Sequence, residues 1–266
     1  MYKVDYHVHT NFSADSNEDI TKVIEKAISM KLDEIAITEH LEIKTGLSEN
    51  YTLDLDSYYK EVEELKKKYK KKLKIIFGVE IGFSRESQDE INKLIKKYEF
   101  DFIISSVHSI GKENFLTNDF FVGKSQKESY TEYFNEVLKA VKEFKNYDVL
   151  GHIDFICRYG EYDTKNLNYE DYKEIIDEIL LTITKDKKGI EVNTSGLRYG
   201  RDSFYPNETI LKRYKELGGK RITIGSDAHK KEDIFYQVEE VIKLLKDIGF
   251  KSYSTFKNRK EKQIML

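Results

Sequence analysis

Short apolar runs and amphipathic stretches alternate along the whole chain. The runs are rich in Val, Ile and Phe, and the stretches between them repeat apolar residues at the spacing of an α-helix. The first pair is the run Val4 to His9, followed by Glu18 to Met30, where Ser16 and Asn17 are candidates for the helix cap. This alternation predicts parallel strands that are joined by helical crossovers.

The same pattern continues to the carboxyl end of the chain. The predicted strands are 4–9, 34–38, 73–81, 102–107, 148–151, 189–193 and 221–226, with a last strand near Tyr253. The predicted helices are 18–30, 56–71, 86–97, 127–144, 169–186, 207–217 and 232–247. About seven strand–helix units favour a closed or nearly closed barrel over a doubly wound open sheet, which would collect ligands at one switch point. We expect a single α/β domain over residues 1–266.

Every histidine of the chain stands at the end of a strand-like run. The six are His7, His9, His40, His108, His152 and His229. A lone histidine in such a place is usually an ordinary hydrogen-bonded side chain, but six that behave alike favour a metal site. The carboxyl ends of barrel strands are also where catalytic groups gather.

Three acidic residues extend this pattern. Glu80 lies in an apolar run, where an unpaired carboxylate would be costly to bury, and it is well placed to bridge two cations. Asp227 precedes His229 by two residues, and Asp15 follows the first histidine pair. We interpret Asp15 as a ligand in preference to a helix cap. The sequence therefore predicts a metal centre built from imidazoles and carboxylates.

Composition limits the partners and the compartment. The chain has 45 Lys and Arg against 48 Asp and Glu, so no global basic field favours nucleic acid. Its one cysteine, Cys157, excludes internal disulfides and favours the cytoplasm. No apolar run approaches the roughly 18 residues of a membrane span. We expect a soluble, unexported protein without nucleic-acid or membrane partners, and the oligomeric state cannot be inferred from the sequence.

Six short motifs together resemble the PHP (polymerase and histidinol phosphatase) family. They are His7-Val8-His9, Glu39-His40, Gly78-Val79-Glu80, Ser106-Val107-His108, Gly151-His152-Ile153-Asp154 and Gly225-Ser226-Asp227-Ala228-His229. The resemblance covers Tyr2 to about His229. The chain length and the segment 191–198 are most similar to the stand-alone histidinol-phosphatase branch.

This resemblance implies a distorted (βα)7 TIM-like barrel with three metal ions. The implied ligands are His7, His9, Glu80 and Asp227 for a first ion, Glu80, His108 and His152 for a second, and Asp15, His40 and His229 for a third. So many imidazoles favour Zn, Mn or Fe over Mg or Ca. The implied reaction is hydrolysis of L-histidinol phosphate to L-histidinol and phosphate, a step of histidine biosynthesis.

A metal-held hydroxide is the predicted nucleophile. Two cations that share a carboxylate can hold hydroxide at neutral pH, because coordination lowers the pKa of water from 15.7 toward roughly 7. The residues predicted to take part in the reaction are Glu80, Asp227, His229 and His40. Ser105, Ser106 and Ser195 are candidates for a covalent alternative, but none has a free histidine as base if all six bind metal.

Arginine is scarce, so arginines in loops after strands are candidate phosphate ligands. Arg158 and Arg198 are predicted to grip the phosphate through two hydrogen bonds each, and Arg201 and Ser195 are further candidates. The long loop 111–124, with its phenylalanines, is interpreted as a lid or as packing on the barrel rim. Cys157 is interpreted as a buried filler, and Asp154 as a residue that orients a metal ligand.

Two other functions are compatible with the sequence. The first is a phosphoesterase that acts on nucleotides or oligonucleotide ends, as other members of the family do. The second is a metal-stabilised accessory module without turnover. The complete ligand set argues against the second, and the absence of a basic, aromatic groove argues against the first.

Overall fold

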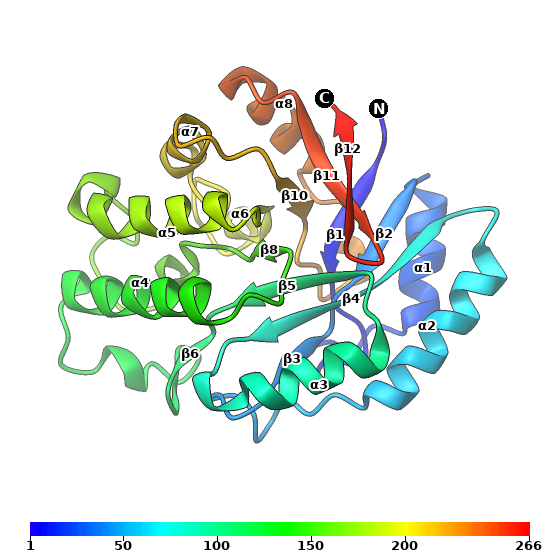
Figure 1. The fold of residues 1–266 in the computed structure, drawn as a ribbon, viewed down its shortest axis with the longest axis horizontal. Helices are drawn as coiled ribbons and strands as arrows, with labels where there is room; N and C mark the ends of the chain where they lie inside the picture. Colours follow the sequence, from blue (N-terminus) through cyan, green and yellow to red (C-terminus); the bar gives the residue numbers. More distant parts are fainter.

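The computed structural model describes residues 1–266, and its parallel strands curl into a nearly closed barrel (Figure 1). The order around the barrel is β1-β2-β4-β5-β8-β9-β10, and β3 extends the path of β2 along β4. The strands are β1 (Val4–Val8), β2 (Glu34–Ile37), β3 (His40–Glu42), β4 (Lys74–Gly82), β5 (Phe102–Ser106), β8 (Val149–Leu150), β9 (Gly189–Asn193) and β10 (Ile222–Gly225).

The first and last strands meet just beyond the end of β10. Val8 pairs with Ala228 in parallel, the His9 amide donates to the Ala228 carbonyl at 2.9 Å, and the Asp227 amide donates to the His7 carbonyl at 2.8 Å. These bonds exclude the open-sheet alternative. They also bring residues from the two ends of the chain together at the carboxyl ends of the strands.

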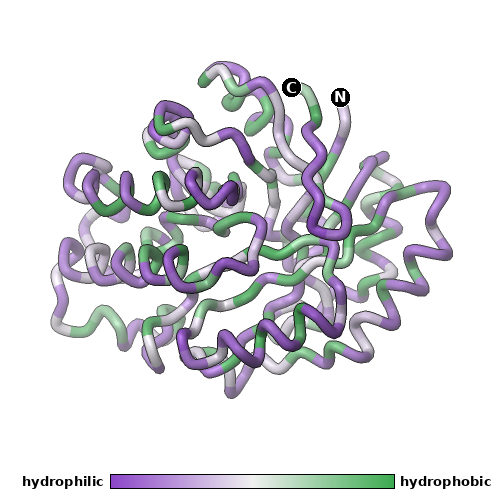
Figure 2. Tube along the Cα trace, viewed as in Figure 1, coloured by the Kyte–Doolittle hydropathy of each residue, from purple (hydrophilic) through white to green (hydrophobic).

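Helices surround the barrel and turn their apolar faces inward. They are α1 (Ile20–Ser29), α2 (Leu55–Tyr69), α3 (Gln88–Tyr98), α4 (Gln126–Glu143), α5 (Lys173–Lys185), α6 (Ser195–Arg198), α7 (Glu208–Glu216) and α8 (Val238–Ile248). Along them hydrophobic and hydrophilic residues alternate, as Figure 2 shows. No helix combines the length and the apolar character that crossing a membrane requires.

Several helix starts differ from the prediction. Helix α5 begins at Lys173 and not near residue 169, where a separate helical turn, Tyr169–Asp171, precedes it. The cap of α1 is Asp19, whose side chain accepts from the Lys22 amide at 3.0 Å, and not Ser16 or Asn17. The last helix begins at Val238 and not near residue 232, because Phe235 and Gln237 adopt left-handed backbone conformations with φ of 63° and 55°. A helix cannot run through such residues.

A C-terminal hairpin covers the amino ends of the barrel strands. It consists of β11 (Ser252–Lys257) and β12 (Lys260–Met265), and only the first of these strands was predicted. The backbone amides of Asn258 and Arg259 donate to Asp101, immediately before β5. The hairpin therefore lies at the end of the barrel opposite the histidines, and Figure 1 shows it beside the N-terminus.

Removing the Phe256 ring should destabilise the protein and leave the arrangement of the histidines unchanged. Phe256 is buried, and its ring centroid lies 5.1 Å from that of Phe102. We expect Phe256→Ala to lower the free energy of unfolding by about 3–5 kcal/mol. Urea denaturation would measure the change, with the exposed neighbour Lys257→Ala as the control. Equal stability of both variants would show that the hairpin contributes little to the fold.

Candidate metal centre and active site

The predicted ligands converge at the carboxyl ends of the barrel strands. His7 lies in β1, His9 directly follows it, His40 opens β3 and Glu80 lies in β4. The others stand in loops after strands, namely Asp15, His108, His152, Asp227 and His229. Asp227 has a left-handed backbone with φ of 54°, which turns the chain sharply after β10. The fold thus brings together every residue of the predicted ligand set.

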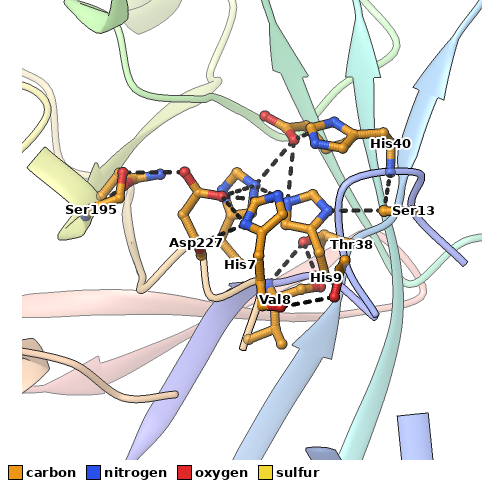
Figure 3. Close-up of polar contacts among 12 residues, drawn as sticks. His7, Val8, His9, Ser13, Thr38, His40, Ser195 and Asp227 are labelled. Carbon is orange, nitrogen blue, oxygen red and sulfur yellow. Dashed lines mark hydrogen bonds and ion pairs between the residues drawn. The ribbon is translucent and has the colours of Figure 1, made fainter. Parts of the chain in front are cut away.

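Four of these side chains surround one point, and Figure 3 labels three of them, His7, His9 and Asp227. Nε2 of His7 lies 3.0 Å from Nε2 of His9, 3.2 Å from Oε2 of Glu80 and 3.7 Å from Oδ1 of Asp227. Nε2 of His9 lies 3.5 Å and 3.4 Å from the same two oxygens. Ligand atoms in a tetrahedral zinc site with bonds of 2.0–2.1 Å lie about 3.3 Å apart. The spacing therefore fits one ion.

A second group of donors uses the other oxygen of Glu80. Oε1 of Glu80 lies 3.2 Å from Nε2 of His108 and 2.9 Å from Nε2 of His152, and the two ring nitrogens are 3.4 Å apart. Because each oxygen of Glu80 faces a different group, this carboxylate has the geometry of a bridge.

A third group lies nearer to solvent. Oδ2 of Asp15 is 3.4 Å from Nε2 of His40 and 3.1 Å from Nε2 of His229. The side chains of Asp15 and His229 keep 33% and 23% of their surface exposed, whereas those of His7 and His9 are fully buried. This group is therefore the one most accessible from outside.

The charges of the cluster fit divalent cations. Burial opposes the charge of Glu80, yet the nearby His7 and His108 hold the pKa of its carboxyl well below the usual range. Burial, with the neighbouring imidazoles of His229 and His40, lowers the pKa of His9 to about 3. At His7, His40 and His108 burial also opposes the charged form, but nearby carboxylates such as Glu80 raise the pKa. Metal binding would replace the protons on these rings and keep positive charge beside the carboxylates. Oε2 of Glu80 is buried without a hydrogen bond, as expected of an oxygen that faces a cation.

A cavity of about 320 Å³ opens over these donors. Part of its lining consists of metal-site residues, and the rest is mainly apolar and aromatic. The other lining residues are Leu47, Tyr51, Phe115, Leu116, Phe155, Tyr159 and Tyr199, with the cations Arg158 and Lys230. Arg158 forms no ion pair, and its guanidinium carbon lies 3.2 Å from the centroid of the Tyr199 ring. An unpaired guanidinium beside the donors is suited to bind an anion.

Two other predicted substrate contacts are turned toward Asp227. The Ser195 hydroxyl donates to Oδ1 of Asn193 at 2.7 Å and lies 3.2 Å from Oδ2 of Asp227 (Figure 3). Nη2 of Arg198 donates to the Asp227 carbonyl at 2.7 Å, and its Nε lies 3.6 Å from Asp233. Neither residue lines the cavity. Both hold the turn that carries Asp227, so their predicted contact with the substrate does not fit this geometry.

Arg201 and Asp154 pair with each other and not with the groups predicted. Nη2 of Arg201 lies 3.4 Å from Oδ2 of Asp154, and that oxygen also accepts from the Asn207 amide at 3.3 Å. The structure thus pairs Arg201 with Asp154 outside the cavity and shows no hydrogen bond from Asp154 to a histidine, and the predicted roles of both residues stay predictions. Cys157 is buried, as its interpretation as a filler requires.

None of the three candidate serines is placed to act as a nucleophile. The Ser106 hydroxyl donates to Oε1 of Glu80 at 2.7 Å, Ser195 is held as described above, and Ser105 is buried. None of them lines the cavity. This arrangement supports attack by water.

The loop 111–124 packs on the barrel rim. It contains β7 (Glu113–Asn114), which pairs with β6 (Ser109–Ile110), and a helical turn at Asp119–Phe121. Its three phenylalanines, Phe115, Phe120 and Phe121, are buried, and Phe115 also forms part of the cavity wall. The packing interpretation fits this loop.

Two glutamates that contact the histidines at Nδ1 were not predicted from the sequence. Glu191 contacts Nδ1 of His7 at 2.6 Å, and Glu42 contacts Nδ1 of His108 at 2.7 Å. Glu191 stands in the apolar run Gly189 to Val192, which is the same signal that identified Glu80. Lys230, at the mouth of the cavity, gave no such signal.

Comparisons with known proteins agree with this geometry. Residues 5–195 match the family model described as the PHP domain. A histidinol-phosphatase of Lactococcus lactis subsp. lactis (strain IL1403) is 36% identical, over 98% of this chain and 96% of that protein. A "Probable histidinol-phosphatase" of Clostridium acetobutylicum is 34% identical, over 86% of this chain and 88% of that protein.

A solved structure shares the whole fold. It is the crystal structure of histidinol phosphate phosphatase from Lactococcus lactis subsp. lactis Il1403, complexed with Zn, L-histidinol and phosphate. The TM-score is 0.88 at 34% identity, and the match covers 98% of this chain and 99% of that chain.

Proposed function

Because this chain belongs to the PHP domain family, we propose that it is a metal-dependent phosphatase that hydrolyses L-histidinol phosphate to L-histidinol and phosphate. It is an enzyme of the histidinol-phosphatase type, a phosphoric monoester hydrolase, and the reaction is a step of histidine biosynthesis. The observation that carries this conclusion is one cavity whose floor holds the clustered imidazoles and carboxylates and whose wall holds the unpaired Arg158.

The metal assignment is part of the proposal. We assign the first ion to His7, His9, Glu80 and Asp227, the second to Glu80, His108 and His152, and the third to Asp15, His40 and His229. The distances within each group are compatible with this division, and His40 also lies 3.0 Å from Glu80, so the third group adjoins the other two. The zinc in the relative's crystal structure supports zinc as the metal. When bound, such ions supply positive charge for the phosphoryl oxygens and lower the pKa of water toward about 7.

Each of the other side chains around the cavity has its own role in the proposed reaction. Arg158 orients the phosphate from the wall with a planar, charge-assisted donor fork. Asp15, His40 and His229 all line the cavity, so the third donor group borders the space that the substrate would occupy. Glu80 and Asp227 supply the negative charge that keeps the cations in place. Water, and no serine, is the nucleophile that this arrangement favours.

The aromatic side chains of the cavity are suited to bind the part of the substrate that carries the imidazole ring. Tyr51, Phe155, Tyr159 and Tyr199 line the cavity together with the donors, and Phe155 stacks on His152 with ring centroids 4.3 Å apart. The imidazole ring of the substrate can pack against such aromatic surfaces. Interactions remote from the reacting bond raise kcat/KM when they help to hold the transition state. The cytoplasmic location and the absence of a nucleic-acid partner stay predictions from composition.

A substrate comparison tests the proposal. We expect kcat/KM for L-histidinol phosphate to exceed that for p-nitrophenyl phosphate by a factor on the order of 100 or more, because the small aryl ester lacks the ammonium and imidazole groups. Phosphate release from L-histidinol phosphate, p-nitrophenyl phosphate and nucleoside monophosphates, measured on one metal-loaded sample, gives the ratio. Equal or faster turnover of the nucleotides would favour the nucleotide phosphoesterase instead.

A further inference from the structure

Two buried carboxylates contact metal-site histidines from the side away from the cavity. Oε1 of Glu191 lies 2.6 Å from Nδ1 of His7, and Oε1 of Glu42 lies 2.7 Å from Nδ1 of His108. Glu191 and Glu42 are only 1% and 4% exposed, and no lysine or arginine pairs with either. A buried carboxylate without a cationic partner is costly, so these positions call for an explanation.

Glu191 also connects the first and second donor groups. Its other oxygen, Oε2, accepts from the backbone amide of His152 at 3.0 Å and from Nδ2 of Asn193 at 3.2 Å. One carboxylate thus contacts the side chain of His7 and the backbone of His152. Any shift of Glu191 would move ligands of both groups.

Glycines in the strands make room for both carboxylates. A Cβ atom on Gly225 would lie less than 3.0 Å from Oε1 of Glu191, and one on Gly82 would lie less than 3.0 Å from both oxygens of Glu42. Real Cβ atoms essentially never come so close to other atoms. Gly225 belongs to the motif that ends in Asp227 and His229, and a Cβ atom there would also lie less than 3.0 Å from the Cβ of His7. The glycine therefore makes room for both His7 and Glu191.

The third donor group lacks this support. Nδ1 of His40 faces Oε2 of Glu80 at 3.0 Å, and Nδ1 of His229 faces the Asp227 carbonyl at 3.1 Å. Neither ring has a separate carboxylate behind it. The buried carboxylates are therefore specific to the two groups that share Glu80.

We propose that Glu191 and Glu42 are positioning residues that orient His7 and His108 for metal binding. A carboxylate that accepts from Nδ1–H fixes the tautomer in which the Nε2 lone pair faces the ion, and it makes the ring a stronger ligand. Through the hydrogen bond that it accepts from the His152 amide, Glu191 also fixes the position of the second donor group relative to the first. The inference rests on the proposed metal site, but it concerns residues that do not themselves contact the ions.

The test is the zinc affinity of Glu191→Gln. A glutamine side chain has one acceptor oxygen, so if it accepts from His7, its NH2 group points at the His152 amide, another donor. We expect the dissociation constant for Zn²⁺ to rise by about 10- to 100-fold. Competition between the metal-free protein and a chromophoric zinc chelator would measure it. The visible spectrum of the Co²⁺-loaded protein should also change, because the geometry around the ion is altered.

Glu34→Gln is the matched control. Glu34 is fully buried and accepts hydrogen bonds from Tyr2 and Tyr6. Unlike Glu191 it also pairs with Lys74, at 2.8 Å, and it lies at the amino end of β2, away from the histidines. This variant should lose stability yet keep the parental zinc affinity and Co²⁺ spectrum. An equal loss of zinc affinity in Glu34→Gln would show that the effect is a general cost of altering a buried carboxylate, and would overturn the proposal.

Glu42→Gln provides a second, independent variant. It should weaken zinc binding and change the Co²⁺ spectrum in the same way, and it decides the question if Glu191→Gln does not fold. Parental zinc affinity in the folded variants would overturn the proposal. Because the assay uses metal alone, such a result would say nothing against hydrolysis of L-histidinol phosphate, which the substrate comparison tests separately.

Discussion

Glu80→Gln should lose bound metal and phosphatase activity together. Each oxygen of Glu80 faces a different group of histidines, and a neutral amide can neither bridge two cations nor offset their charge. We expect kcat/KM for L-histidinol phosphate to fall by a factor on the order of 1,000 or more, and the metal content to fall by more than one ion per chain. Elemental analysis and phosphate release on the same sample measure both quantities.

The control for this variant is again Glu34→Gln, a buried carboxylate at the other end of the barrel. It should keep its metal and its kcat/KM once folding is confirmed by circular dichroism. If Glu80→Gln kept the parental metal content with an intact fold, the assignment of Glu80 as the bridge would be wrong. If it lost metal but kept its rate, the reaction would not depend on the cluster.

Arg158→Ala should lose rate but keep metal. Arg158 lines the cavity, has no carboxylate partner and stacks on Tyr199, so its donors are free for the phosphate. We expect kcat/KM to fall by a factor on the order of 100, which corresponds to about 2.7 kcal/mol of transition-state stabilisation. Arg158→Lys should also be impaired, because a point charge cannot reproduce the planar fork. Kinetics, metal content and melting temperature would be measured side by side.

Arg198 and Arg201 provide the comparison. Arg198 donates to the carbonyl of Asp227, so Arg198→Ala should disturb a ligand and lower the metal content as well as the rate. Arg201 pairs with buried Asp154 outside the cavity, so Arg201→Ala should mainly lower stability. If Arg158→Ala retained the parental kcat/KM, another group would have to bind the phosphate, and Lys230 at the cavity mouth would be the first to test.

The barrel and its ligands were predictable because both depend on pattern. Strands such as Glu34–Ile37 and Gly189–Asn193 are short, mostly apolar runs between amphipathic helices, and parallel strands present their carboxyl ends to one side. His7 and His9 are two residues apart at the end of β1, so extended backbone there directs both rings to one face. The residues that end these strands therefore meet without any further information.

Side-chain directions in loops were not predictable in the same way. Ser195 and Arg198 lie in the short helix α6, and both turn toward Asp227, whose position follows from the left-handed turn after β10. No local pattern reveals that turn. Strand β12 was missed because its residues are mostly polar and exposed, so period-two alternation is weak there.

The most direct measurement is a metal titration of activity toward L-histidinol phosphate. The protein would be stripped with a chelator, checked for an intact fold, and then supplied with measured equivalents of Zn²⁺, Mn²⁺ or Fe²⁺ while phosphate release is followed. The proposed function predicts no release from the metal-free protein and a rate that rises with added metal until about three equivalents are bound. Full activity in the metal-free protein, or no activity toward L-histidinol phosphate at any metal content, would contradict it.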